Sequence, residues 1–459
     1  MGLRVLFCPS RMNAIEERPS AESAPGLHVL IAQAPTIRAR FGTPILSVAL
    51  FAFLLSVFAA SPVITSTDSR WAIHTAMSFA KGHGGDLTAY LPIIAKQEFY
   101  SIEYPDGRPR TRYPIGTALL ALPAVVVIGW LRPQWAAGLP NGMPVKTEKF
   151  IASIVGAAAG VVFYWVILSQ FQSQAIALAS TAIFSLCTSI WSTATRALWQ
   201  HGPLVLMLVI AMLILVRARK RPELVQYLAL PLAMAYLVRP IAIVSIAVLS
   251  TYVLLFYRAW FVRYICWAML VAIPWIAYNF AIYHHPVPDY YHREAFSVFT
   301  QFREGLLGNL FSPSRGLFVF SPVLLFALSG FALALRDREL RPLNLAYGAI
   351  IVGNTIIIGA ASRWWGGHSF GPRFMTDIIP FLAYFTAFNF RLPESFRPRT
   401  QIAVSAALAI LALVSLTIHA QGALRYATWQ WNIAPRNIDD DPSRAWDWRD
   451  PQFARIWHP

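Results

Sequence analysis

An aspartate near the start of the chain is the first candidate for chemistry. Asp68 lies in residues 65–71, directly after an apolar run long enough to cross a membrane. A carboxylate held there, beside Arg70, can act as a general base or bind a metal ion at the membrane face. The same position suits a helix N-cap, because aspartate is favoured before the first helical residue. The sequence therefore predicts Asp68 as a catalytic residue and Arg70 as a substrate contact, with the N-cap as the alternative.

Arginines at the edges of apolar runs form the second group. Guanidinium groups bind phosphate through charge-assisted, often bidentate hydrogen bonds. Arg239 stands between two apolar runs without an acidic neighbour, so it either reaches the polar interface or meets an anion. For Arg112 the alternative is a basic loop side chain that reaches lipid headgroups. The predicted phosphate-binding residues are Arg112, Arg239, Arg315 and Arg373.

Histidines and aromatic residues accompany these arginines. Aromatic rings, glycines, a histidine and an arginine in residues 363–377 suit stacking on a sugar ring and holding a phosphate. Arg373 and Asp377 are four residues apart, so a helix that starts at Pro372 would bring them to one face as an ion pair. The predicted substrate contacts, besides Arg70, are Tyr113, His201, Trp365, His368 and Asp377.

No cofactor is predicted from the motifs. His284, His285 and Asp289 are close in sequence, but their spacing fits no standard zinc site. The three cysteines are far apart and form no CxxC pair, and the chain has no Gly-rich nucleotide loop. No metal ligand is assigned, although a divalent metal stays open as a cofactor.

Composition identifies the setting in which these residues work. Of the 459 residues, 56% are apolar and 13% are charged, about half the charged fraction of a soluble protein. The formal net charge of +16 is concentrated in clusters between apolar runs, as expected of cytoplasmic loops facing anionic lipid. The sequence therefore predicts an integral membrane protein with lipid as its surroundings, and excludes a nucleic-acid partner.

Twelve apolar runs predict an all-α polytopic membrane protein. Four basic clusters can all be cytoplasmic only if one run in the first half fails to cross, and the Pro-rich run 114–131 is the best choice. Eleven transmembrane helices are predicted, with twelve as the alternative. The runs are 43–60, 114–131, 150–168, 174–190, 201–216, 224–238, 240–257, 263–282, 318–335, 343–360, 373–390 and 401–419.

Three regions follow from this topology. Residues 1–42 are polar and predicted to be a disordered cytoplasmic tail, and residues 43–420 form the transmembrane domain. Its long first external loop, 61–113, contains a loosely amphipathic stretch, 68–81, predicted to be a helix at the membrane surface. Residues 421–459 form an external Trp-rich tail, whose tryptophans are expected at the interface.

Taken together, these motifs resemble the GT-C superfamily of membrane glycosyltransferases, which includes protein O-mannosyltransferases, the lipid A aminoarabinose transferase and rhizobial lipopolysaccharide sugar transferases. The resemblance covers about residues 43–390. It rests on Asp68 after the first span, Tyr113-Pro114 with Gly116, the Trp-Gln-His run 199–201, Arg239-Pro240, and runs 311–316 and 371–374.

The resemblance implies an inverting hexosyl- or pentosyltransferase of the cell envelope, multi-pass in the inner (plasma) membrane, with its active site on the external or periplasmic face. A sugar would pass from a polyprenyl-phosphate carrier to a lipid, polysaccharide or protein. Asp68 would be the general base or would orient the acceptor, and Arg112, Arg239, Arg315 or Arg373 would hold the carrier phosphate. Some relatives have two acids where this chain has Asp68-Ser69, which leaves Asp106 or Asp377 as a second acid.

A second class of function remains open at this level. Arginines that face a membrane cavity would equally serve a transporter or flippase of an anionic lipid or lipid-linked sugar, without any chemistry. The role of Asp68 separates the two, because only a transferase needs a base at the acceptor oxygen.

Overall fold

The computed structural model describes residues 37–96, 98–293, 301–393 and 395–457. The chain divides into a unit Met1–Val48 and a unit Ala49–Pro459. Helix α2 (Ile37–Ala60) begins in the first unit, so the end of the predicted disordered tail, residues 37–42, is helical. The rest of that tail, residues 1–36, lies outside the described residues.

Helices make up nearly all of the secondary structure. The longer ones after α2 are α3 (Ala72–Ala80), α5 (Gly116–Leu131), α7 (Val145–Phe171), α8 (Gln174–Leu186), α9 (His201–Ala218), α10 (Ala229–Val238), α11 (Ile243–Phe256), α12 (Arg258–Tyr283), α14 (Phe302–Phe311), α16 (Phe326–Ala334), α17 (Arg341–Gly359), α18 (Ile379–Ala387) and α19 (Pro398–Leu424). The short α-helices are α4 (Leu91–Ile94), α6 (Pro133–Gly138), α13 (Tyr290–Arg293), α15 (Leu317–Phe320) and α20 (Ala427–Gln430).

Shorter turns of helix join these elements. The 3₁₀ helices are η1 (Thr88–Tyr90), η2 (Leu139–Asn141), η4 (Pro222–Leu228), η5 (Pro240–Ala242), η6 (Pro322–Leu325), η7 (Arg373–Ile378), η8 (Phe388–Phe390), η9 (Pro442–Trp446) and η10 (Gln452–Trp457), and η3 (Ile190–Ala194) is a π-helix. Strands β1 (Ile102–Glu103) and β2 (Arg110–Thr111) pair antiparallel, with Ile102 opposite Thr111.

Five helices within the described residues are long and apolar enough to cross a membrane: α7, α9, α12, α17 and α19. Shorter apolar helices accompany them at Pro44–Ala60, Gln174–Leu186, Pro222–Val238, Pro240–Phe256 and Pro322–Ala334. The predicted all-α membrane architecture is therefore confirmed, whereas the count of eleven or twelve spans stays a prediction.

The Pro-rich run near residue 114 is sharply bent. Helix α5 and the following segment Pro133–Asn141 meet at 111°, the geometry of a broken span or a re-entrant loop. The break falls at Arg132, with φ −134° and ψ 71°, because the residue before a proline avoids the helical region.

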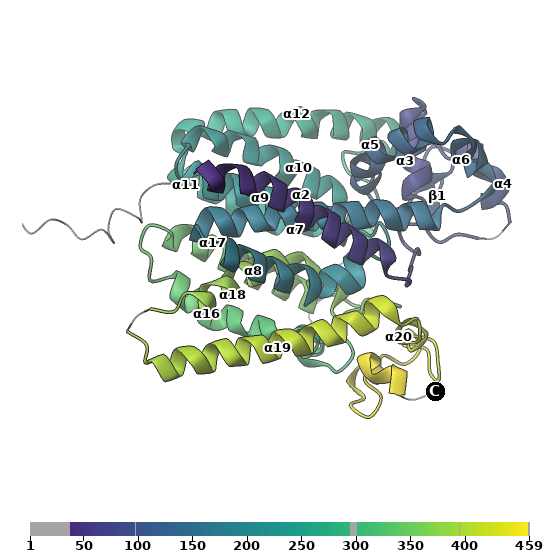
Figure 1. Cartoon of the computed structure of the whole chain (residues 1–459). Coiled ribbons are helices and arrows are strands. Elements are labelled where there is room, and N and C mark those ends of the chain that lie inside the picture. Colours follow the sequence, from purple (N-terminus) through teal and green to yellow (C-terminus); the bar gives the residue numbers. More distant parts are fainter. Residues whose placement is uncertain (1–36, 97, 294–300, 394, 458–459) are drawn as a thin grey trace, which may run out of the picture. The chain divides into compact units, whose positions relative to one another are not determined.

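Helices α7 and α9 pack against each other and form the centre of the larger unit (Figure 1). About two thirds or more of their apolar residues are buried, whereas only about a fifth of those of α12 and α19 are. Gln172 ends α7 in the left-handed conformation and Ser173 caps α8, which turns the chain back along α7.

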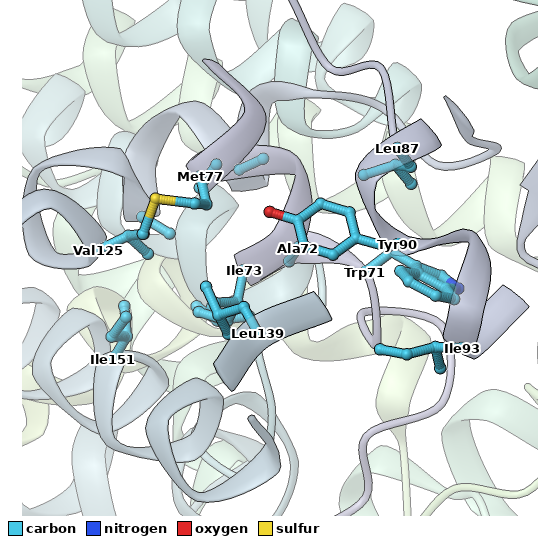
Figure 2. Close-up of a cluster of buried hydrophobic side chains, with 14 of the residues drawn as sticks. Trp71, Ala72, Ile73, Met77, Leu87, Tyr90, Ile93, Val125, Leu139 and Ile151 are labelled. Carbon is cyan, nitrogen blue, oxygen red and sulfur yellow. The ribbon is translucent and has the colours of Figure 1, made fainter. Parts of the chain in front are cut away.

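The first loop is a folded layer around its own hydrophobic cluster (Figure 2). Trp71, which precedes α3, and Ile73 and Ala76 on α3 are fully buried against α5 and neighbouring short helices. The predicted helix therefore exists, but it is enclosed by protein instead of lying exposed at a membrane surface, because its polar residues His74 and Thr75 are also covered.

The C-terminal segment is likewise folded. Trp431, Ile438 and Ala445 pack with Trp364 and Trp365 in a small buried cluster. Trp431 is fully buried, so the expectation that the tail tryptophans mark an interface is wrong for this residue. In Figure 1, α20 and the C-terminus lie at the same end of the larger unit as α3, α4 and β1.

Candidate active site

Four predicted site residues lie at the ends of helices. Asp68 precedes α3, His201 is the first residue of α9, Arg239 follows the last residue of α10, and Arg373 begins η7. Pro240 explains one of these ends, because the residue before a proline avoids the helical region and Arg239 is extended, with φ −157° and ψ 129°. Ending a helix there frees the side chain to face a common cavity.

A glycine brings two of these elements together. A Cβ on Gly116, at the start of α5, would collide with the backbone of Leu237 and Val238 at the end of α10. The glycine after Tyr113-Pro114 therefore permits the close contact that places the first loop beside Arg239.

Asp68 forms an ion pair with Arg373, and its other oxygen accepts a 2.8 Å hydrogen bond from the Tyr100 hydroxyl. Burial alone would raise the pKa of Asp68, but the charge and hydrogen bond of Arg373, aided by the hydroxyls of Tyr100 and Tyr113, hold the pKa below its usual 3.8. Asp68 is therefore an ionised carboxylate at neutral pH.

The neighbours of this pair keep their protons. Burial and the charge of Asp68 raise the pKa of Tyr100 and of Tyr113, so both hydroxyls remain hydrogen-bond donors. Burial lowers the pKa of Arg373, but the facing carboxylate more than compensates, so the guanidinium stays charged. Its plane stacks 4.1 Å from the ring centre of Trp199.

The N-cap alternative for Asp68 is wrong. The N-cap of α3 is Trp71, which makes no side-chain capping bond. Instead, the carboxylate of Asp68 is held from across the fold, and its loop is fixed by the buried carboxylate of Glu148. Ser66 and Ser69 donate to Glu148, the latter at 2.5 Å, as does the Leu198 amide at 3.1 Å. Glu148 thus joins the loop of Asp68 to the segment that carries Trp199.

A second network lies behind the first. Asp377 accepts a 2.8 Å hydrogen bond from His201 Nδ1 and a 2.6 Å ion-pair contact from Arg239. Nδ1 of His201 also lies 2.7 Å from NH1 of Arg239, and Nε2 accepts from Nε of Arg373 at 3.4 Å. His201 therefore connects the two ion pairs.

The predicted pairing of Arg373 with Asp377 is wrong. Residues 373–378 form the 3₁₀ helix η7, whose three residues per turn place positions four apart on different faces. Arg373 consequently faces Asp68, and Asp377 faces His201 and Arg239.

These groups line a cavity of about 690 Å³. This is within the range of small-molecule sites. The predicted residues Asp68, Arg112, Tyr113, His201, Arg239, His368 and Arg373 all line it, and Asp377 lies directly behind. Arg112 and the unpredicted Arg363 have no side-chain hydrogen-bond partner among the described residues, so their charges are available to a ligand.

Besides Asp377, three predicted site residues lie outside the lining. Arg70 stacks over Phe99 in the first loop. Arg315 spends its donors on protein oxygens, including Gln452 at 2.8 Å and Asn432 at 2.7 Å, so the prediction that it holds a phosphate is wrong. Trp365 is buried in the C-terminal cluster and not free to stack on a sugar.

The two candidates for a second catalytic acid, Asp106 and Asp377, differ in their position relative to the cavity. Asp106 is bound by Arg110 through a 2.6 Å contact and does not line the cavity, whereas Asp377 adjoins it. Among the described residues, no three His, Cys, Asp or Glu side chains are arranged to hold a metal ion.

Comparison with solved structures identifies the fold. The structure of ArnT from Cupriavidus metallidurans bound to undecaprenyl phosphate matches with a TM-score of 0.50 and 13% identity, covering 90% of this chain and 76% of that one. The apo structure of the same protein matches with a TM-score of 0.51 and 14% identity, covering 84% and 75%. The chain has the GT-C fold. No protein-family model and no curated protein sequence matches it.

Within this GT-C fold, the cavity also contains residues that the sequence did not predict. Tyr100 and Tyr290 had no distinguishing spacing, whereas Trp199 belonged to the Trp-Gln-His run but was not predicted to be a site residue. Arg363 is the first residue of the run 363–377, which had been selected as a possible sugar- and phosphate-binding motif, and this position could have identified it. Asp439 belongs to the C-terminal segment, where nothing in the sequence indicated a cavity.

Proposed function

We propose that this chain is a membrane glycosyltransferase of the GT-C type that moves a sugar from a polyprenyl-phosphate donor to an acceptor on the non-cytoplasmic face of the inner membrane. The observation that carries the proposal is one cavity in which an ionised Asp68 faces Arg373 and shares the space with Arg112, Arg239 and Arg363. The fold supports it, since ArnT was crystallised with undecaprenyl phosphate.

The chemistry divides between the carboxylate and the arginines. The acceptor oxygen bonds to the anomeric carbon, and Asp68 takes the proton released from that hydroxyl. The bond from the anomeric carbon to the phosphate oxygen breaks, and its electron pair stays on the phosphate. Arg239, with Arg112, neutralises the charge that develops there. Attack from the side opposite the phosphate would invert the anomeric configuration.

Arg373 has a double task in this scheme. It holds Asp68 ionised and in place. Its guanidinium has five hydrogens and donates one each to Asp68, His201 and the Gly366 carbonyl, so the others can bind a phosphate. When a phosphate enters, the charge of Arg373 is shared between two anions, which loosens its hold on Asp68. The carboxylate then becomes a better base at the moment the donor is bound.

The test compares cell-envelope glycans and lipid-linked sugars in a deletion strain complemented with wild type, Asp68→Asn or Asp106→Asn. The two aspartates are matched, because each forms an ion pair with an arginine and only Asp68 lines the cavity. We expect wild type and Asp106→Asn to restore the missing sugar. Asp68→Asn should lower transfer by about 10²–10⁴-fold, the usual loss of a general base.

Protein level and undecaprenyl phosphate binding are measured in parallel, so that loss of folding is separated from loss of chemistry. Full restoration by Asp68→Asn would overturn the transferase assignment and favour a flippase of an anionic lipid. A sugar that is present in the deletion strain at wild-type level would exclude both.

A further inference from the structure

The C-terminal segment supplies a carboxylate to the cavity wall. Asp439 lines the same cavity as Asp68, although the two residues come from opposite ends of the chain. The segment is anchored by Arg315, which donates to Asn432 and Gln452, and by Gln452, which donates to the Ser369 carbonyl at 2.8 Å. Asp439 is thus held in position by buried contacts.

One oxygen of Asp439 is fixed and the other is available. Trp365 Nε1 donates to Oδ1 of Asp439 at 2.8 Å, and the side chain of Asp439 is 36% exposed. A carboxylate offers about four lone-pair positions, so most of its accepting capacity remains for a ligand. Trp365 therefore acts as a positioning residue for Asp439.

The neighbouring His368 has an assigned hydrogen. Its Nε2 lies 2.8 Å from Oδ1 of Asn437 and 3.6 Å from Oδ2 of Asp439. The Asn437 atom is an oxygen, because it also accepts the backbone N–H of Asp439 at 3.1 Å. Nε2 faces two oxygens and therefore carries a hydrogen, so His368 is held by Asn437 beside the carboxylate of Asp439.

Asp439 and His368 lie side by side in the cavity wall, here called the acceptor corner, where the carboxylate of Asp439 accepts hydrogen bonds. The acceptor corner adjoins the part of the cavity lined by Arg112, Arg239, Arg363 and Arg373, here called the arginine side. One turn joins the two parts. The Gly366 carbonyl accepts from Arg373 at 3.3 Å, and a Cβ on Gly367 would lie 3.8 Å from Asp439. A phosphate has no hydrogen to donate to this corner and is repelled by the carboxylate. Groups rich in hydroxyl hydrogens are complementary to it.

We propose that the acceptor corner is the subsite that binds the hydroxyls of a sugar ring, while the arginine side binds the phosphate. The inference rests on the proposed function for the identity of its ligand as a sugar. A site that hydrogen-bonds hydroxyls rejects ligands without them strongly, because its polar groups are then left unpaired. Asp439 would accordingly determine which sugar the protein selects.

The test measures equilibrium binding in nanodiscs by native mass spectrometry. The ligands are undecaprenyl phosphate and its glucosyl, mannosyl and galactosyl phosphodiesters. We define the sugar gain as the affinity for the tightest-binding diester divided by the affinity for undecaprenyl phosphate. We expect a sugar gain of at least about tenfold in wild type. Asp439→Asn should reduce it to about threefold or less, with the affinity for undecaprenyl phosphate unchanged. Asp440→Asn, an exposed neighbour outside the lining, is the matched control.

A second arm distinguishes donor from acceptor sugar. If the sugar gain is unaltered but Asp439→Asn raises the KM for the acceptor by about tenfold with kcat preserved, the corner binds the acceptor sugar. If neither quantity changes relative to Asp440→Asn, the proposal is overturned. The binding arm needs no turnover, so a wild-type protein that shows a sugar gain but no transfer would refute the enzyme and keep the subsite.

Discussion

Replacing Arg239 by lysine tests the phosphate site while keeping its charge. The guanidinium donates one hydrogen from NH1 to Asp377, and its Nε and NH2 have no acceptor among the described residues. The side chain is 13% exposed and faces the cavity. Arginine can therefore satisfy Asp377 and grip a phosphate with two parallel hydrogen bonds at the same time.

Lysine cannot do both, because its ammonium is a compact point charge without a fork geometry. A hydrogen bond to a charged group contributes about 1.5–3 kcal/mol. Losing one such bond to the phosphate should weaken binding by about 10- to 160-fold, at 1.36 kcal/mol per tenfold. The retained charge at position 239 still neutralises Asp377, so the fold should persist.

The assay is titration of the protein in nanodiscs with undecaprenyl phosphate. Arg70→Lys is the matched control, since Arg70 stacks on Phe99 outside the cavity and should leave the affinity within about twofold. Thermal stability of both variants is measured alongside. Arg239→Lys that binds as tightly as wild type, or an equal loss in both variants, would refute the assignment of Arg239 to the phosphate.

Three further predictions test the support of the site. Glu148→Gln should lower transfer about tenfold and reduce the Tm without weakening undecaprenyl phosphate binding, because the amide nitrogen that replaces one carboxyl oxygen cannot accept from the serine hydroxyls of the Asp68 loop. Unchanged kinetics would contradict this. Gly116→Ala should destabilise by about 1–3 kcal/mol and weaken phosphate binding, because its Cβ meets the Leu237 backbone. Gly138→Ala, with open space around its Cβ, should be neutral in the same thermal melt and titration. Since the pKa of Asp68 is depressed, its contribution to stability and activity is present above 3.8 and lost only as pH falls through the lower folded pKa. A pH profile of kcat/KM for transfer, which reports the protein without bound donor, should then show no acid limb from Asp68 between about pH 4 and 7, and a limb assigned to Asp68 there would refute the ion pair.

Several features of this protein followed from local sequence alone. Composition and apolar runs determined an all-α membrane protein, because about 20 apolar residues in a row have few other stable settings. Proline ended α10 so that Arg239 had to leave the helix, which is a purely local effect of the residue after it. The residue types at Asp68, His201 and His368 were also sufficient to single them out as candidates.

Only the tertiary structure decided which of these groups meet. Arg373 pairs with Asp68, 305 residues away, instead of Asp377, because the local helix is 3₁₀ and the first loop folds over it. Arg315 could not be distinguished from the other arginines in the sequence, yet it donates hydrogen bonds to Asn432 and Gln452 of the C-terminal segment. Asp439 gave no signal at all, since its place on the cavity wall depends on contacts made by that segment. Spacing along a chain governs local geometry, whereas a polar side chain takes its role from partners that only long-range packing brings within hydrogen-bond distance.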